Sequence, residues 1–222
     1  MSVFCLVHGS TQNATAWKLL AGELESRGHQ VVCPELPADK PGASAAYYVE
    51  AVMSALRKIP QPPVVVAHSV TGLFLPLIAR KRPLTQMVFL AATIPEIGKS
   101  AFQQLQSHPE MICPEWVGKD PTKDAGLAMR FLFHDCNSEV AQWALTTLRL
   151  MYLQGVLTEV CPLDQWPDVP SSYVVCQHDR TLNPDWWRIE ARRRLGCVPL
   201  EMESGHCPHL SRPAELADLL CR

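Results

Sequence analysis

The stretch from Pro63 to Gly72 constrains the fold of this chain more than any other. It reads Pro-Val-Val-Val-Ala-His-Ser-Val-Thr-Gly, and its three consecutive β-branched residues are typical of a strand that is buried on both faces. The apolar residues 73–79 follow and are long enough for a buried helix, in which Pro76 is tolerated only near the first turns. The chain is therefore predicted to reverse sharply from strand to helix at Ser69.

Such a reversal has chemical consequences for the residue at its centre. A strand that turns at once into a helix holds that residue in a strained backbone conformation, with its side chain standing clear. The residues two before and two after it must be small, and here they are Ala67 and Thr71, where glycines are usual. The N–H of Val70 points into the same space at a helix N-terminus, which favours negative charge. Ser69 is thus a candidate nucleophile beside half of an oxyanion hole, although the pattern also fits a serine that caps an ordinary helix.

The rest of the chain alternates short apolar runs with helical patterns. The runs predict strands at residues 3–7, 31–33, 64–66, 87–91, 173–176 and 198–201. Helical spacing covers residues 14–27, 44–59, 184–195 and 213–220. Uniformly apolar strands that alternate with helices are typical of a parallel sheet covered on both faces. The predicted fold class is therefore α/β, with about six strands in a mainly parallel sheet.

The alternation stops in the middle of the chain. Residues 95–162 contain no convincing strand, but they contain amphipathic stretches, of which residues 139–153 are the clearest. We interpret residues 1–94 and 163–222 as one core domain and residues 95–162 as a helical cap inserted into it. A length of 222 residues suits one domain with an insertion better than two independent units.

Composition argues against several classes of function. The net charge of −2 provides no electrostatic basis for binding nucleic acid or an anionic membrane. No apolar run reaches the length of about 18 residues that a membrane-spanning helix needs, and the chain enters its first strand without the features of a signal peptide. The nine cysteines are odd in number and scattered. We therefore expect free thiols in the reducing cytoplasm rather than a disulfide framework.

Three polar residues are expected to meet at one edge of the sheet. Ligands of open parallel sheets bind beyond the carboxyl ends of the strands, and Ser69, Asp179 and His206 each follow a predicted strand. A serine hydroxyl becomes a useful nucleophile when a neutral imidazole accepts its proton and a carboxylate holds that imidazole in the right tautomer. We predict that Ser69 attacks, His206 acts as the base and Asp179 orients it.

The loop after the first strand is expected to complete this site. Gly9 lets the backbone approach a substrate closely, and His8 is expected to support the loop. The N–H of Ser10 can then form the oxyanion hole together with the N–H of Val70.

Other polar and aromatic residues are interpreted as structural. His206-Cys207-x-His209 could be half of a metal site, but no further ligands follow at close spacing, so we expect no metal and no cofactor. His68 and His178 are expected to be hydrogen-bonded structural histidines. Asp39 is assigned to a loop and Asp135 to the start of a helix. Packing in the core or the cap is expected for Trp116, Trp143, Trp186 and Trp187.

These pieces together resemble the α/β-hydrolase fold over essentially the whole chain. The matching segments are Val7-His8-Gly9 with Trp17 downstream, Ala67-His68-Ser69, His178-Asp179-Arg180-Thr181, and Gly205-His206-x-Pro208-x-Leu210-Ser211-x-Pro213. Within that fold the chain most resembles the plant methylesterase and hydroxynitrile lyase group and its bacterial esterase relatives. The resemblance implies that the cap shapes the acyl and alcohol pockets.

The resemblance implies a serine hydrolase that cleaves a small carboxylic ester, thioester or lactone through an acyl-enzyme. Two alternatives stay open, namely a receptor that keeps the triad as a small-ligand pocket and a hydroxynitrile lyase. The similar lyases place a lysine directly after the catalytic histidine and a threonine after the histidine of the first loop. Cys207 and Gly9 stand at those positions here, which favours the hydrolase. We expect a small-molecule ester as partner, neither nucleic acid nor membrane, and allow for a homodimer.

Overall fold

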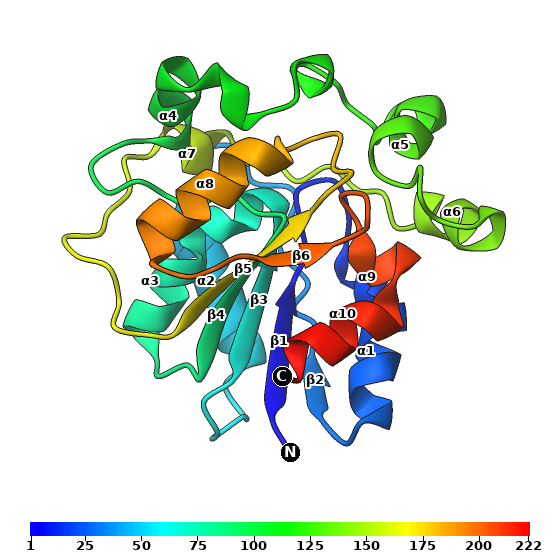
Figure 1. The fold of residues 1–222 in the computed structure, drawn as a ribbon. Coiled ribbons are helices and arrows are strands. Elements are labelled where there is room, and N and C mark those ends of the chain that lie inside the picture. Colours follow the sequence, from blue (N-terminus) through cyan, green and yellow to red (C-terminus); the bar gives the residue numbers. More distant parts are fainter.

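The computed structural model describes all 222 residues, and a single sheet runs through its centre (Figure 1). The six strands follow the order β2-β1-β3-β4-β5-β6, and every neighbouring pair is parallel. They are β1 (Val3–Val7), β2 (Gln30–Val32), β3 (Val64–His68), β4 (Gln86–Leu90), β5 (Ser171–Cys176) and β6 (Leu200–Met202). The predicted α/β class is confirmed, and the sheet is parallel throughout.

The last strand starts later than the sequence pattern indicates. We expected it at residues 198–201, whereas β6 begins at Leu200. Val198 is 77% exposed, and Pro199 has no N–H to donate to a neighbouring strand. The apolar run therefore enters the sheet only after the proline.

Helices cover both faces of the sheet, as predicted. Successive strand residues point to opposite faces, so Cys5 and Val7 of β1 pack in one layer while Phe4 and Leu6 pack in the other. The first layer contains α2 (Ala45–Ala55), α3 (Leu75–Lys81) and α8 (Pro184–Leu195), and the second contains α1 (Lys18–Ser26) and α10 (Pro213–Leu220). Figure 1 shows the two groups of helices on opposite sides of the strands.

Residues 95–162, here called the upper segment, lie along the edge of the sheet at which the strands end (Figure 1). The segment adds no strand to the sheet, and its helices are α4 (Ala101–Ser107), α5 (Ala125–Phe131), α6 (Ser138–Leu145) and α7 (Gln154–Thr158). Isolated bridges join it to the loops that follow β1 and β5, through Gln12 with Leu148 and Ile112 with Leu182. The segment is thereby held directly over the predicted site.

The amphipathic stretch at residues 139–153 is helical only in its first half. Helix α6 ends at Leu145, and the following residues leave the helical path to bond the loop after β1. The N–H of Arg149 donates to the carbonyl of Thr11 at 3.0 Å, and the N–H of Met151 donates to the carbonyl of Ser10 at 2.7 Å. These long-range hydrogen bonds replace the helical ones and override the amphipathic pattern.

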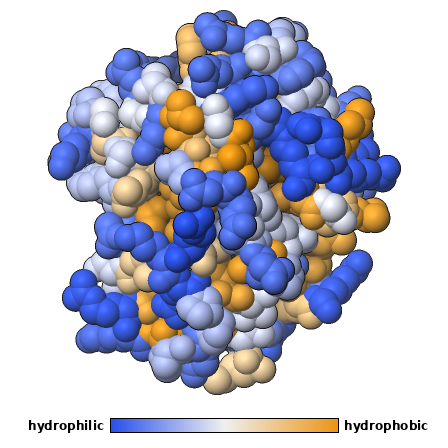
Figure 2. All heavy atoms as spheres, turned by 90° about the vertical axis from the view of Figure 1, so that its left-hand side faces the viewer, coloured by the Kyte–Doolittle hydropathy of each residue, from blue (hydrophilic) through white to orange (hydrophobic).

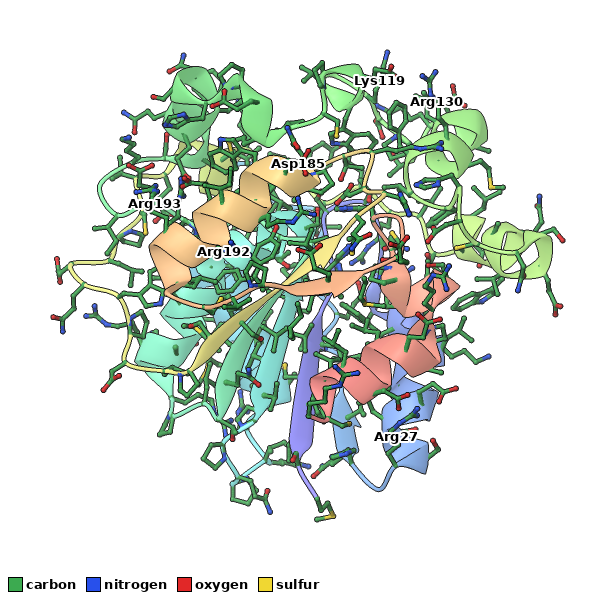
Figure 3. The ribbon with its side chains drawn as sticks, in the orientation of Figure 1. Arg27, Lys119, Arg130, Asp185, Arg192 and Arg193 are labelled. Atoms are coloured by element: carbon green, nitrogen blue, oxygen red, sulfur yellow. The ribbon has the colours of Figure 1, made fainter.

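The surface is dominated by charged and polar groups. Figure 3 shows Lys119, Arg130 and Arg193 extending outward at the periphery, while Arg27 lies between α1 and α10 and pairs with Glu23 and Asp218. Figure 2 shows the face that carries α3 and α4, on which hydrophobic residues reach the surface in several patches separated by hydrophilic ones. No helix combines the length and the apolar character needed to cross a membrane. All nine cysteines are free thiols.

Candidate active site

The chain turns sharply between β3 and α3, and Ser69 stands at the turn. Residues Ser69–Phe74 form a 3-10 helix that leads into α3. Ser69 has a φ of 61°, a left-handed conformation that costs a residue other than glycine on the order of 1 to 3 kcal/mol. Pro76 lies in the first turn of α3, where its missing N–H needs no partner. The strained turn inferred from the sequence is therefore present, with a short 3-10 helix ahead of the α-helix.

Close packing explains the departures from the usual small residues around Ser69. A Cβ on Gly72 would lie 2.4 Å from the carbonyl oxygen of Thr93, so only glycine fits there. Thr71 is buried, and its hydroxyl donates to the carbonyl of His68 at 2.8 Å. The tightest approach therefore falls one residue later than the usual pattern, which leaves space for the threonine.

Asp179 and His206 meet at the same edge of the sheet. Nδ1 of His206 lies 2.7 Å from Oδ2 of Asp179, and both side chains are buried. The other carboxylate oxygen, Oδ1, accepts the N–H groups of Thr181 at 2.7 Å and Leu182 at 3.2 Å. These bonds fix the carboxylate, and the carboxylate fixes the imidazole. Nε2 of His206 is then the nitrogen that is available for proton transfer.

Thr181 belongs to the same hydrogen-bonded unit, a role that we did not assign from the sequence. Its hydroxyl lies 3.0 Å from Oδ1 of Asp179 and 2.9 Å from Nδ1 of His206. Because an ionised carboxylate only accepts hydrogen bonds, the hydroxyl donates to Asp179. The Asp-x-Thr spacing is the signal that could have identified this residue, since an Asp side chain commonly bonds the backbone two residues on.

The N–H groups of Ser10 and Val70 are free to bind a ligand. Neither donates a hydrogen bond to another protein atom. Both residues line one cavity together with Ser69 and His206. Unpaired N–H donors beside a nucleophile are what an oxyanion hole requires. The two positions named from the sequence therefore lie at the cavity, next to the strained serine.

The loop that carries Ser10 is held in place by His8. The imidazole is buried, its Nε2 accepts the N–H of Leu36 at 3.1 Å, and its Nδ1 lies 2.8 Å from the carbonyl oxygen of Gly9. Because Nε2 accepts, Nδ1 carries the proton and donates to Gly9. Burial lowers the pKa of His8 and favours this neutral form. His8 therefore braces the loop from the core side, while Met151 bonds it from the upper segment.

Three buried groups lie behind His206. His68 Nε2 is hydrogen-bonded to the carbonyl oxygen of His206 at 2.8 Å, and the ring of His209 packs on those of Trp17 and His68. Possible ligand atoms of His68, Cys207 and His209 lie within 4.8 Å of one another. Of the half-site seen in the sequence, Cys207 and His209 belong to this cluster together with His68, whereas His206 does not, and no fourth metal-binding side chain joins them.

This cluster is uncharged at neutral pH. Burial lowers the pKa of His209 to about 3 and holds the pKa of His68 well below its usual value. Burial also raises the pKa of the Cys207 thiol well above its usual range. The residue that follows His206 is therefore a neutral thiol and supplies no cation to the site.

The burial of His209 predicts how the stability of the fold depends on pH. Its pKa is about 3 in the folded chain and about 6.5 in an unfolded chain, so the unfolded state binds the extra proton first. The contribution of the neutral His209 to the free energy of unfolding is therefore complete above about pH 6.5 and is lost as the pH falls toward 3. Between pH 7 and pH 5 this one group should lower the free energy of unfolding by about 2 kcal/mol.

Urea denaturation of the wild type and of His209→Met at pH 7 and pH 5 measures this contribution. From pH 7 to pH 5 the free energy of unfolding of the variant should fall by about 2 kcal/mol less than that of the wild type, because methionine binds no proton. Equal losses in the two proteins would show that the histidine is not responsible for the acid sensitivity.

We expected Asp135 at the start of a helix, and this prediction is wrong. It lies in the turn between α5 and α6, and Asn137 caps α6. Its Oδ2 accepts the N–H of Gly205 at 2.7 Å, so the upper segment directly supports the loop that carries His206. A Cβ on Gly205 would lie 2.6 Å from Oδ1 of Asp135, which explains the glycine. The two residues are 70 positions apart in the sequence, so no local sequence pattern predicts their contact.

The other side chains interpreted as structural are found in varied surroundings. His178 is exposed and lies 2.8 Å from a carboxylate oxygen of Glu203, and Asp39 lies in a loop. Trp187 is buried and stacks on Tyr173. Trp116 differs from the other tryptophans because it lines the cavity beside Ser69.

A largely apolar cavity extends from Ser69 and His206 into the upper segment. Its volume is about 230 Å³, slightly below the roughly 300–1,000 Å³ that is usual for small-molecule sites. Helices α4 and α7 contribute to its walls. Its apolar lining includes Leu73, Leu105, Met111, Trp116, Leu132 and Leu157. The candidate nucleophile, the base and both free N–H groups therefore border one space that can hold an apolar ligand.

Comparison with known proteins places this geometry in a family. The model of the alpha/beta hydrolase family matches residues 6–219. Polyneuridine aldehyde esterase from Rauvolfia serpentina is 24% identical over 250 aligned positions, which cover 98% of this chain and 93% of that protein. The alpha/beta hydrolase nvfD of Aspergillus novofumigatus is 24% identical over 210 positions, covering 86% of this chain and 82% of that protein.

Solved structures agree in fold over the full length. A crystal structure of polyneuridine aldehyde esterase has a TM-score of 0.81 at 21% identity and covers 100% of this chain and 98% of that one. A methylesterase from Arabidopsis has a TM-score of 0.77 at 19% identity, with the same coverage of 100% and 98%. The resemblance to the plant methylesterase group is confirmed. Because the family model matches nearly the whole chain, this protein belongs to the alpha/beta hydrolase family.

Proposed function

We propose that this protein is a serine hydrolase that cleaves a small carboxylic ester, thioester or lactone. The observation that carries the proposal is the 2.7 Å contact between Asp179 and His206 at the cavity that also holds the strained Ser69. Membership of a hydrolase family with esterase relatives supports it. We further propose that the upper segment is the cap of the site, because Leu105, Trp116 and Leu157 of this segment line the cavity.

The reaction begins when Ser69 Oγ attacks the ester carbonyl carbon while His206 Nε2 takes the hydroxyl proton. Asp179 stabilises the resulting imidazolium through Nδ1. The oxygen of the tetrahedral intermediate accepts hydrogen bonds from the N–H groups of Ser10 and Val70. His206 then gives its proton to the leaving alcohol, and an acyl-enzyme remains. A water molecule, deprotonated by His206, attacks the acyl carbon and releases the acid and Ser69.

The surroundings of the triad favour this reaction over cyanohydrin cleavage. A lyase needs a cation near the leaving cyanide, and the buried thiol of Cys207 is neutral because burial raises its pKa. Gly9 leaves the backbone of the first loop open to an oxyanion, as ester hydrolysis requires. Both departures from the lyase pattern therefore support a hydrolase.

The test combines turnover with covalent labelling. The purified protein should hydrolyse p-nitrophenyl acetate and react with a fluorophosphonate probe, and neither should occur in Ser69→Ala. Mandelonitrile serves as the competing substrate. Cyanide release without ester turnover would contradict the hydrolase, and the absence of both turnover and labelling would favour a small-ligand receptor.

A second prediction concerns the oxyanion hole and is tested by substituting Gly9. A Cβ at this position would lie 3.2 Å from Cβ of Ser69 and 3.2 Å from Nδ1 of His68, so the loop must shift and carry the Ser10 N–H with it. Complete loss of one oxyanion donor costs roughly 10²–10³ in kcat. For Gly9→Ala we therefore expect kcat for p-nitrophenyl acetate to fall by roughly 10- to 100-fold.

Gly22→Ala is the matched control for that variant. A Cβ on this helical glycine of α1 would meet no atom within 4 Å, so its activity should equal that of the wild type. If Gly9→Ala also retains full activity, the Ser10 N–H does not bind the oxyanion.

The nine free thiols also support a proposal about compartment. Thiols persist where the environment is reducing, and we propose that the protein works in such a compartment, the cytoplasm. Fractionation of the source cells followed by activity-based labelling tests this assignment. Labelling confined to an oxidising compartment would contradict it.

A further inference from the structure

The cavity beside Ser69 contains no charged side chain that could pair with a charged substrate. Its lining includes no Asp, Glu, Lys or Arg, and its polar side chains are the imidazole of His206, the indole of Trp116 and the hydroxyls of serines and threonines. Two cations of the upper segment, Lys119 and Arg130, point outward in Figure 3 and do not line the cavity. A charged substituent would lose its hydration there without a partner, which is costly. The lining therefore selects an uncharged ligand.

One of the two buried hydroxyls in this apolar lining has no partner in the protein. Thr93 follows β4, is 6% exposed and lines the cavity. The hydroxyls of Thr71 and Thr181, also buried, bond protein atoms at 2.8 Å and 3.0 Å. The Thr93 hydroxyl forms no hydrogen bond with a protein atom, and its oxygen is not one of the fully buried polar atoms that lack a partner. It is thus a hydrogen-bonding group that is open toward a bound ligand.

The position of Thr93 relates this group to the reacting bond. Its N–H donates to the carbonyl of Ser69 at 3.0 Å, so the two residues are neighbours across the turn. A ligand group that reaches the Thr93 hydroxyl must therefore lie close to the carbonyl that Ser69 attacks. Leu73 and Ala101 of the same cavity offer only apolar contacts, while the hydroxyls of Ser10 and Thr11, in the loop after β1, are its other candidate polar contacts.

We propose that the substrate is an uncharged ester with an apolar body and a hydroxyl or carbonyl substituent close to the scissile bond, and that Thr93 recognises this substituent. The proposal rests on the hydrolase function argued above and names the substrate class of the same site. Thr93 can donate to a carbonyl or hydroxyl oxygen and can accept from a hydroxyl. It is a specificity-determining residue, while the triad performs the chemistry.

Two matched esters test the role of Thr93. Methyl mandelate and methyl phenylacetate differ by one hydroxyl beside the ester carbonyl, and each mandelate enantiomer is assayed separately. Thr93→Val keeps the shape of the side chain and removes its hydrogen bond. The ratio of kcat/KM for the preferred mandelate ester to that for the phenylacetate should fall roughly 3- to 10-fold, the effect of one net hydrogen bond. Thr93→Ser, which keeps a hydroxyl, should retain the wild-type ratio.

A second pair tests the requirement for an uncharged ligand. Monomethyl terephthalate is an anion at pH 7, and methyl 4-methylbenzoate is its neutral counterpart of similar size. We expect kcat/KM for the anion to be lower by roughly 100-fold or more, because no cation in the cavity replaces its hydration. Comparable rates for the two esters would overturn this part of the proposal.

The outcomes separate this proposal from the proposed function. An unchanged ratio for both mandelate enantiomers in folded Thr93→Val would overturn recognition by Thr93 while leaving ester hydrolysis by Ser69 intact. An equal loss for mandelate and phenylacetate would have the same meaning, since it would indicate a structural role. Turnover of either ester that survives in Ser69→Ala would instead contradict the hydrolase function itself.

Discussion

Ser69→Ala should be a folded protein whose kcat for p-nitrophenyl acetate is lower by roughly 10⁴-fold or more, because the members of a triad act as a unit. The substitution removes the only atom that is proposed to form a bond with the substrate. It leaves the turn intact, since alanine meets the same backbone restriction at a φ of 61° as serine does. Stability should therefore change little while activity disappears.

Steady-state assays and fluorophosphonate labelling measure this effect, and thermal denaturation checks the fold. Ser54→Ala is a suitable control, because Ser54 is an exposed serine of α2 and its loss should leave both readouts unchanged. If purified Ser69→Ala retains more than a tenth of the wild-type activity, Ser69 is not the nucleophile.

Asp179→Asn is expected to have the next largest effect, a fall in kcat of roughly 10²- to 10⁴-fold without unfolding. The hydrogen bonds around the carboxylate explain why. Oδ1 accepts two backbone N–H groups, from Thr181 and Leu182, so the asparagine carbonyl oxygen should occupy that place. The asparagine NH₂ group then faces Nδ1 of His206 and donates to it. This places the imidazole proton on Nε2, where it prevents the ring from accepting the Ser69 proton.

Activity assays at pH 7, together with circular dichroism, distinguish this tautomer effect from unfolding. Asp39→Asn is the matched control, because Asp39 lies in a loop and its substitution should not affect turnover. Near wild-type activity of Asp179→Asn would mean that another acid orients His206. Asp135 would then be tested next, since it already bonds Gly205 in the same loop.

The sequence by itself determined the architecture and the order of the site residues. Strand and helix patterns are local, because β-branched runs and helical spacing act over a few residues. A parallel sheet then brings all carboxyl ends of its strands to one edge. For this reason Ser69, Asp179 and His206 could be placed at a common edge without knowledge of any long-range contact. The strain at Ser69 was also predictable, because it follows from the abrupt strand-to-helix reversal.

Only the tertiary structure decided how the upper segment meets this edge. The residues after α6 bond the loop of Ser10 instead of continuing a helix, and Asp135 bonds Gly205 across 70 residues of sequence. The cavity and the open hydroxyl of Thr93 likewise arise from elements that are distant along the chain. Such features depend on which distant groups become neighbours. Their hydrogen bonds and their burial override local helix propensity only when the whole chain has packed. Local periodicity carries no information about those partners, so it could predict the edge that carries the candidate site but not the walls of that site.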